Sequence, residues 1–276
     1  MAALQTNSTK FSGSQTDPSA TLRTGFGNQK KKYIFLKRWL APTAIFLLAL
    51  MVRVPALGQF VTVDEPFWVD RSRVFTAGLL FGDYECPALA RDGRTFASQG
   101  WGCTFQTAHP GVTTMWGGGL GLLIHYWQAV RSTGVDLRVY LENLATDPLD
   151  RTLIAPTRWP LVIIASVFIP VFYGLLARLL SERIALIAAL LLALNPFHIA
   201  LSRVLHQDAL TATFMTLSLL TLIGCWLQGW RWPWLLVSAV CAGLACLSKP
   251  VGWFMLPYAA VLGGVSLLWS RWHNGS

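Results

Sequence analysis

The chain has 276 residues, of which 54% are hydrophobic and only 13% are charged. A typical soluble domain has about 25% charged residues. The charges are also unevenly distributed: residues 59–158 contain 10 of the 13 acidic and 8 of the 22 basic residues, whereas residues 159–276 contain 8 charges in total. This composition excludes an ordinary soluble enzyme and predicts that the second half of the chain is embedded in a membrane. The net charge of +9 comes from Lys and Arg beside apolar stretches, which argues against nucleic-acid binding.

The amino-terminal part predicts a tail followed by a membrane anchor. Residues 1–29 are rich in Ser, Thr, Gln and Gly and lack a periodic apolar face, so we expect a disordered cytoplasmic tail. A basic flank and the first transmembrane helix follow over residues 30–57, where residues 39–57 are long enough to cross a bilayer. The basic flank places the amino end in the cytoplasm. A cleaved signal peptide is the alternative, but no clear small-residue cleavage site follows the apolar stretch.

Five further apolar stretches predict an all-α polytopic membrane protein with about six transmembrane helices. They occupy residues 159–180, 184–200, 209–227, 234–247 and 251–269. Trp and Tyr at their ends are typical of the aromatic belts at membrane interfaces. We therefore expect a large extracytoplasmic loop with interfacial helices over residues 58–158, and a five-helix transmembrane bundle over residues 159–276.

Residues 110–130 are apolar enough to form either a further span or an interfacial helix. Several glycines weaken a helix there, and His125 and Gln128 interrupt it. We favour an interfacial or re-entrant helix, because six spans place every candidate site residue on one face of the membrane. With six spans the short cytoplasmic turns contain Arg178, Arg183, Arg231 and Arg271.

Two adjacent carboxylates, Asp64 and Glu65, follow the first span and precede residues 66–80, which can form an amphipathic helix. One interpretation is a stabilising interaction with the positive end of the helix dipole. The other is a general base held near the bilayer, where partial desolvation raises the pKa of a carboxylate.

Arg203, Asp208 and Lys249 are isolated charges in an otherwise apolar part of the chain. Burying an ionisable residue within the membrane costs free energy, so such residues are usually paired or functional. Taken singly, each of these three could instead extend its charged group to the membrane interface. Together with the carboxylates near the first span they suit a lipid phosphate: cations neutralise its oxygens while a carboxylate accepts a proton from an incoming hydroxyl. His109 could join them, but no histidine has metal-ligand spacing.

Two cysteines, Cys86 and Cys103, lie in the polar segment without the spacing of a zinc site. They are either free thiols or, if the segment is extracytoplasmic, partners in a disulfide.

The order of these features resembles the GT-C glycosyltransferases, in particular the protein O-mannosyltransferase and lipid A aminoarabinose transferase branch. The resemblance runs from about residue 39 to about residue 269 and depends on order and spacing together. It is carried by Asp64-Glu65 after the first span, His109-Pro110 opening the interfacial helix, Arg158 heading the next span, Asn195-Pro196, Ser202-Arg203, Asp208 and residues 243–249.

This resemblance implies a membrane glycosyltransferase that transfers a sugar from a polyprenyl-phosphate donor to an acceptor hydroxyl, with inversion at the anomeric carbon. The acceptor would be a protein, lipid or glycan, and the active site would face the outside of a bacterial cytoplasmic membrane. No nucleotide-binding loop or metal cluster is required, and a need for a divalent metal stays open. The implied residues are Asp64 as catalytic base, Glu65 in its support, Arg203 and Lys249 on the donor phosphate, and Asp208, His109 and Arg158 in supporting roles.

The chain also departs from the family. His109-Pro110-Gly111 stands where members commonly have His-Pro-Pro, and members have about twice as many spans. In this interpretation the chain is a fragment, a split gene product or a reduced homologue, and a second chain could complete the fold. The alternatives are a transporter or channel subunit, which predicts polar residues at mid-span, and a non-catalytic lipid-binding module, which would tolerate loss of Asp64.

Overall fold

A computed structural model describes residues 39–86, 99–105, 111–144, 151–227 and 231–274. The chain divides into two compact units after residue 41, and the following description concerns the unit from residue 42 onward. This unit is built from helices, and its described residues form no strand beyond one isolated bridge between Glu85 and Gln99. The all-α architecture that the composition predicted is therefore confirmed.

The apolar stretches form helices long enough to cross a membrane. Among the described residues three helical segments meet the length and hydropathy expected of a span, and a bent pair of helices makes a fourth candidate. The three are α5 (Arg151–Leu179), α8 (Gln207–Leu227) and Pro250–Trp269, which comprises η4 (Pro250–Phe254) and most of α10 (Met255–Asn274). The bent pair is α6 (Glu182–Leu194) and α7 (Pro196–Ser202), which meet at an angle of 59°. The chain is thus an integral membrane protein.

Two shorter apolar helices complete the set, the helix of Trp39–Arg53 and α9 (Trp232–Ser248). Each of the six apolar stretches therefore falls on one helix or one bent pair. Six spans stay a prediction, because the two shorter helices have fewer residues than the roughly 20 that usually cross a bilayer.

Helix α5 begins earlier than expected, at Arg151 instead of Trp159. Charged and proline residues in this stretch suggested a loop, but Leu153 and Ile154 are each only 1% exposed. Burial of these two side chains makes a helical start favourable. The Thr157 hydroxyl also donates to the carbonyls of Leu153 and Ile154, within the turn that contains Pro156.

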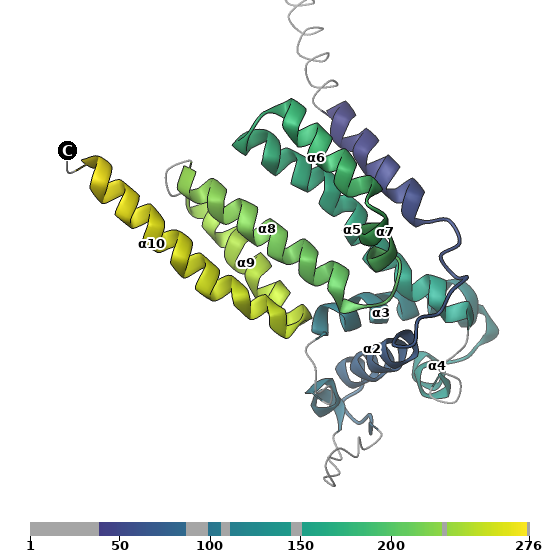
Figure 1. Ribbon diagram of the computed structural model, residues 1–276. Coiled ribbons are helices and arrows are strands. Elements are labelled where there is room, and N and C mark those ends of the chain that lie inside the picture. The colour runs from purple at the N-terminus through teal and green to yellow at the C-terminus, as the bar shows by residue number, and fades with distance from the viewer. Residues whose placement is uncertain (1–38, 87–98, 106–110, 145–150, 228–230, 275–276) are drawn as a thin grey trace, which may run out of the picture. The chain divides into compact units, whose positions relative to one another are not determined.

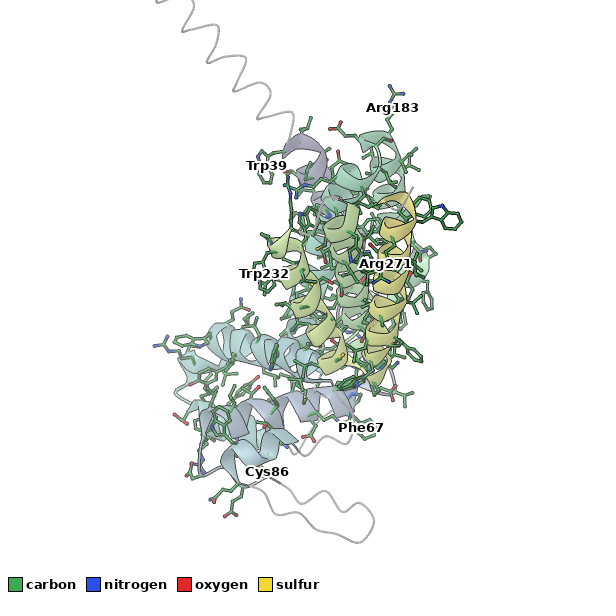
Figure 2. The ribbon with its side chains drawn as sticks, turned by 90° about the vertical axis from the view of Figure 1, so that its left-hand side faces the viewer. Trp39, Phe67, Cys86, Arg183, Trp232 and Arg271 are labelled. Atoms are coloured by element: carbon green, nitrogen blue, oxygen red, sulfur yellow. A yellow bond between two sulfur atoms is a disulfide. The ribbon has the colours of Figure 1, made fainter. Side chains whose placement is uncertain are left out.

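Three helices of the long loop gather at one end of α8 and α9: α2 (Glu65–Leu80), α3 (Val112–His125) and α4 (Leu137–Asn143). Figures 1 and 2 show α2 and α3 lying across the direction of α8 and α9. Helix α3 packs against α2, α5, α8 and α9. In Figure 2 Cys86, beyond α2, and Arg183, at the start of α6, lie at opposite ends of this unit.

Helix α3 has two contrasting faces. Its glycines at 117, 118, 119 and 121 are buried, which lets its backbone approach α2 and α5 closely. The opposite side exposes a stripe of apolar side chains at helical spacing, formed by Trp116, Leu120, Ile124 and Trp127. Helix α3 continues directly into η2 (Tyr126–Val130), which contains Trp127, and then into η3 (Arg131–Thr133). The orientation of α3 across α8 and α9, together with the stripe, favours the interfacial interpretation of residues 110–130.

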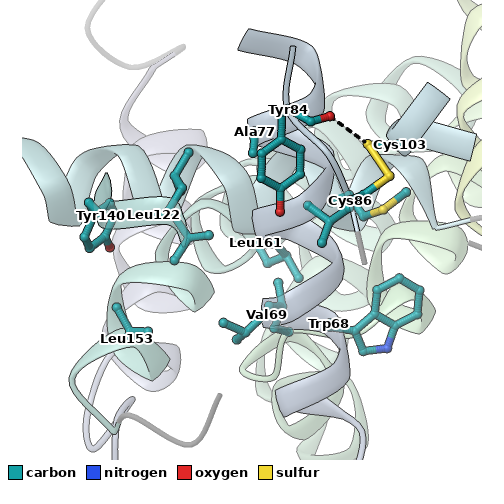
Figure 3. Packing of buried hydrophobic residues seen from close by; sticks show 14 of the residues in the cluster. Trp68, Val69, Ala77, Tyr84, Cys86, Cys103, Leu122, Tyr140, Leu153 and Leu161 are labelled. Atoms are coloured by element: carbon teal, nitrogen blue, oxygen red, sulfur yellow. Dashed lines mark hydrogen bonds between the residues drawn. A yellow bond between two sulfur atoms is a disulfide. The ribbon is translucent and has the colours of Figure 1, made fainter. Parts of the chain in front are cut away.

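A buried apolar cluster joins α2, α3, α4 and α5 beneath this stripe (Figure 3). Trp68 and Val69 of α2 are each 3% exposed, and Leu122 of α3 is fully buried. Cys86 and Cys103 form a disulfide at the edge of the cluster, with 5.7 Å between their Cα atoms. The loop helices therefore share a core with α5 and with the start of α8.

The close approach of α3 to α5 gives a testable prediction. Gly121→Ala should lower the free energy of unfolding by about 1–3 kcal/mol, because its Cβ would lie 2.4 Å from the Pro156 carbonyl oxygen and 2.5 Å from the Thr157 Cα. Backbone atoms cannot rotate away from such a clash. Gly174→Ala in α5 is the matched control, since a Cβ there meets no atom within 4 Å. Thermal unfolding in detergent measures both, and equal stability of the two variants would contradict the prediction.

Candidate functional site

The two adjacent carboxylates at the start of α2 have opposite environments. Asp64 precedes the helix as its N-cap residue, makes no capping hydrogen bond, and has a side chain that is 66% exposed. Glu65 is the first helical residue and is fully buried. Only Asp64 is therefore accessible to a substrate.

Glu65 is held by a buried ion pair with Arg158 of α5. Its Oε1 accepts hydrogen bonds from Arg158 Nε at 2.6 Å and from the backbone N–H of Leu205 at 2.9 Å. Its Oε2 accepts from Arg158 Nη2 at 2.5 Å and from the backbone N–H of Thr62 at 2.8 Å. Burial alone would raise the pKa of Glu65, but these hydrogen bonds and the charge of Arg158 outweigh it and hold that pKa below its usual value.

Arg158 also fixes the segment that leads from the first helix to Asp64. Its guanidinium donates to the backbone carbonyls of Leu57 and Phe60. The pair of Glu65 and Arg158 thus joins this segment, α2, α5 and the turn before α8. The ion pair therefore holds the backbone of these segments in place.

Asp64 instead begins a row of ionisable side chains that come from three separate parts of the sequence. Its Oδ2 lies 3.9 Å from His206 Nε2, and His206 Nδ1 lies 3.3 Å from Asp208 Oδ2. Asp208 Oδ1 in turn pairs with Lys249 Nζ at 2.5 Å. We call these four side chains the charged row. The structure therefore brings together Asp64, Asp208 and Lys249, which the sequence singled out separately.

The helix arrangement explains why these residues meet. Asp208 lies in the first turn of α8, and Lys249 directly follows the last residue of α9. The two helices pack side by side and are linked by a short connection, so the start of α8 lies near the end of α9. Helix α3 also contacts α9 at this end, where Thr113 Oγ1 and Ser248 Oγ are 2.6 Å apart.

Arg203, the other expected phosphate ligand, lies at the end of α7. Its side chain donates to the backbone carbonyl of Pro55, between the first helix and α2. It is three residues before His206 and only partly buried, on the same connection from α7 to α8. His109 was also expected here, but it lies outside the described residues.

Two further residues have roles that sequence reasoning missed. His206 is not among the candidates from the sequence, and only the structure shows its position between two carboxylates. Arg53 is fully buried although it lies within the first apolar stretch. Its guanidinium donates to Ser202 Oγ at 3.0 Å and to the Ala193 carbonyl at 3.3 Å, so it fastens the bend between α6 and α7. The presence of a charged residue inside a predicted span could have marked Arg53 as a residue with a buried partner.

The described residues contain no group of three or more His, Cys, Asp or Glu side chains arranged to hold a metal ion.

The fold and this site define an all-α membrane protein with the charged row at one end of its helices. Residues 149–275 match the family model described as dolichyl-phosphate-mannose-protein mannosyltransferase. No curated protein and no solved structure matches the chain. Over residues 149–275 the family match supports the resemblance to GT-C glycosyltransferases, and it supports a membrane glycosyltransferase of the GT-C type.

Proposed function

We propose that this protein transfers a sugar from a polyprenyl-phosphate donor to an acceptor hydroxyl at the extracytoplasmic face of a bacterial cytoplasmic membrane. The observation that carries the proposal is the charged row: an exposed carboxylate, Asp64, is connected through His206 and Asp208 to a cation, Lys249. A base and an anion-binding cation at one end of a membrane bundle are the two groups that this reaction needs.

In the proposed reaction Asp64 accepts the proton of the acceptor hydroxyl. The hydroxyl oxygen forms a bond to the anomeric carbon of the sugar while the bond from that carbon to the phosphate oxygen breaks. The electron pair of the broken bond stays on the phosphate, and polyprenyl phosphate leaves. Attack from the face opposite the leaving group inverts the anomeric carbon. Lys249 and Arg203 stabilise the negative charge that develops on the phosphate.

Charge placement supports an extracytoplasmic site. In the six-span topology Arg183 lies in a cytoplasmic turn. It is at the opposite end of the described unit from Cys86 (Figure 2). The disulfide of Cys86 and Cys103 suits an oxidising compartment. The loop of residues 58–158 would then lie on the outer surface, followed by the transmembrane bundle of residues 159–276.

The exposed stripe of α3 supports the interfacial part of this proposal. Arg131 lies over the ring of Trp127, with 4.1 Å between its guanidinium carbon and the ring centroid. A Trp with a neighbouring cation at the end of an apolar stripe is typical of a helix that lies in the membrane interface. Such a helix would hold the charged row at the depth of a lipid headgroup.

The proposal predicts that Lys249→Gln weakens use of the donor. Membranes that contain the chain, supplied with labelled dolichyl phosphate mannose, should transfer label to protein, lipid or glycan. The variant should lower kcat/KM for this donor about 10- to 100-fold, since a hydrogen bond to a charged group contributes about 1.5–3 kcal/mol.

Arg183→Gln is the matched control for this measurement, because it removes an exposed cation at the other end of the unit. We expect it to retain the kcat/KM of the wild type. A wild-type chain that transfers label from no polyprenyl-phosphate sugar, or a Lys249→Gln variant with unchanged kcat/KM, would refute the proposal.

A further inference from the structure

His206 has a carboxylate beside each nitrogen of its ring. Asp64 Oδ2 lies 3.9 Å from Nε2, a distance for charge attraction and too long for a hydrogen bond. Asp208 Oδ2 lies 3.3 Å from Nδ1 on the other side. The same Nδ1 lies 3.4 Å from the backbone nitrogen of Asp208, which donates a hydrogen bond to it when the ring is neutral. His206 therefore has partners in both protonation states.

The orientation of the ring is fixed by packing. Trp68 of α2 meets His206 edge to face, with 6.2 Å between the ring centroids. The preceding residue, Leu205, is fully buried, and its backbone N–H is held by Glu65. The imidazole is only 22% exposed, so a change in its charge is felt mainly by the neighbouring carboxylates.

The other charges around the ring have partners of their own. Glu65 is paired with Arg158, and Arg71 lies over the Trp68 ring at 4.9 Å. Arg203 donates to the Pro55 carbonyl. Among the described residues the groups that face His206 directly are thus Asp64 and Asp208, and Lys249 acts on it through Asp208.

Asp208 is shared between His206 and Lys249. Without donor, the Lys249 ammonium neutralises Asp208 at 2.5 Å. A phosphate that engages Lys249 competes with Asp208 for that charge. Asp208 then faces His206 with its negative charge uncompensated, while Asp64 stands on the other side of the ring. Two flanking carboxylates favour the charged form of an imidazole.

We propose that His206 takes up one proton when the donor phosphate engages Lys249, and that its imidazolium then holds Asp64 ionised and in place. This inference rests on the proposed function, because it takes the donor phosphate as the group that draws Lys249 away. His206 is in this view a positioning residue: it touches neither the sugar nor the phosphate, and it couples the donor cation to the base.

The direction of the pH dependence follows from linkage. Donor binding raises the affinity of His206 for a proton, so protonation of His206 must equally favour donor binding. The affinity for donor should therefore fall as the pH rises. We expect the Kd of the donor to increase about tenfold between pH 6 and pH 8. The phosphodiester of the donor keeps a single negative charge throughout this range, so it contributes no proton of its own.

Calorimetric binding of dolichyl phosphate mannose to the purified full chain in detergent tests the proposal. Runs at pH 7 in buffers of different ionisation enthalpy count the protons exchanged. The wild type should take up about half a proton for each donor bound at this pH, the average uptake that corresponds to a tenfold rise in Kd over two pH units. His206→Gln and His206→Asn should bind donor with little proton uptake and a Kd that no longer rises with pH. The Asn amide oxygen can still accept the hydrogen bond from the Asp208 N–H, so this variant keeps the local backbone contact.

His125→Gln is the matched control, because His125 pairs with Tyr140 at 2.9 Å, within the loop helices, and makes no contact with the charged row. It should behave as the wild type. Donor binding without proton uptake in the wild type, or undiminished uptake in both His206 variants, would overturn the inference and leave the proposed function intact. A wild-type chain that binds no donor would overturn both.

Discussion

Asp64→Asn should lower the rate of sugar transfer by about 100- to 10,000-fold, the range in which a positioned general base contributes to catalysis. Asn has nearly the shape of Asp but cannot accept a proton at neutral pH. The Asp64 side chain is 66% exposed and makes no capping hydrogen bond to α2, so the substitution should leave stability almost unchanged. The rate at saturating dolichyl phosphate mannose, measured beside the donor Kd, separates these effects.

Glu182→Gln provides the control for Asp64→Asn. It makes the same change of carboxylate to amide at an exposed position in the first turn of α6, next to Arg183 and away from the charged row. We expect full activity from this variant. If Asp64→Asn retained more than about a third of the wild-type rate, Asp64 would not be the base, and a non-catalytic lipid-binding module would become the better interpretation.

Loss of either partner of the buried Glu65 and Arg158 pair should be the most destabilising change in this region. Glu65→Gln or Arg158→Met leaves the remaining charge buried without its counter-ion, which typically costs about 3–5 kcal/mol. The pair is 1% and 4% exposed and joins segments 93 residues apart. Thermal unfolding in detergent should show a large decrease in Tm for each single variant.

The double variant distinguishes an ion pair from two independent contacts. If the two charges mainly compensate one another, Glu65→Gln with Arg158→Met should be less destabilised than the sum of the single changes. Additive losses would contradict a coupled pair. We also expect the wild type to lose this stabilisation on acidification, since the pKa of Glu65 is lowered in the folded state. Its contribution is complete above the usual Glu pKa of about 4.3 and is lost as the pH falls through the lowered value.

The predictions for Asp64→Asn and Glu65→Gln distinguish the roles of the two adjacent carboxylates. Asp64→Asn should give a stable protein with little activity, whereas Glu65→Gln should give an unstable protein whose defect is in folding. The sequence marked both residues as candidates for catalysis and could not distinguish them. Successive positions on a helix differ by about 100° in direction, so a one-residue step is enough to exchange solvent for the interior.

The sequence by itself determined the class of protein and most of its helices. Long apolar stretches with few charges are stable only as helices in a bilayer, because hydrocarbon cannot satisfy backbone polar groups. An amphipathic pattern predicted the helix of residues 66–80, which the structure places within α2 at Glu65–Leu80. The order of the isolated charges sufficed for the resemblance to GT-C glycosyltransferases, which the family match supports over residues 149–275.

Tertiary structure alone decided which charges contact one another. Asp64, His206 and Lys249 are far apart in the chain, and nothing in their local sequence states that α8 begins where α9 ends and where α2 starts. The early start of α5 at Arg151 has the same origin, because burial of Leu153 and Ile154 outweighs the local preference of a charged, proline-containing segment. Hydropathy is a sum over neighbouring residues, whereas a pairing depends on distances that only the packed helices set.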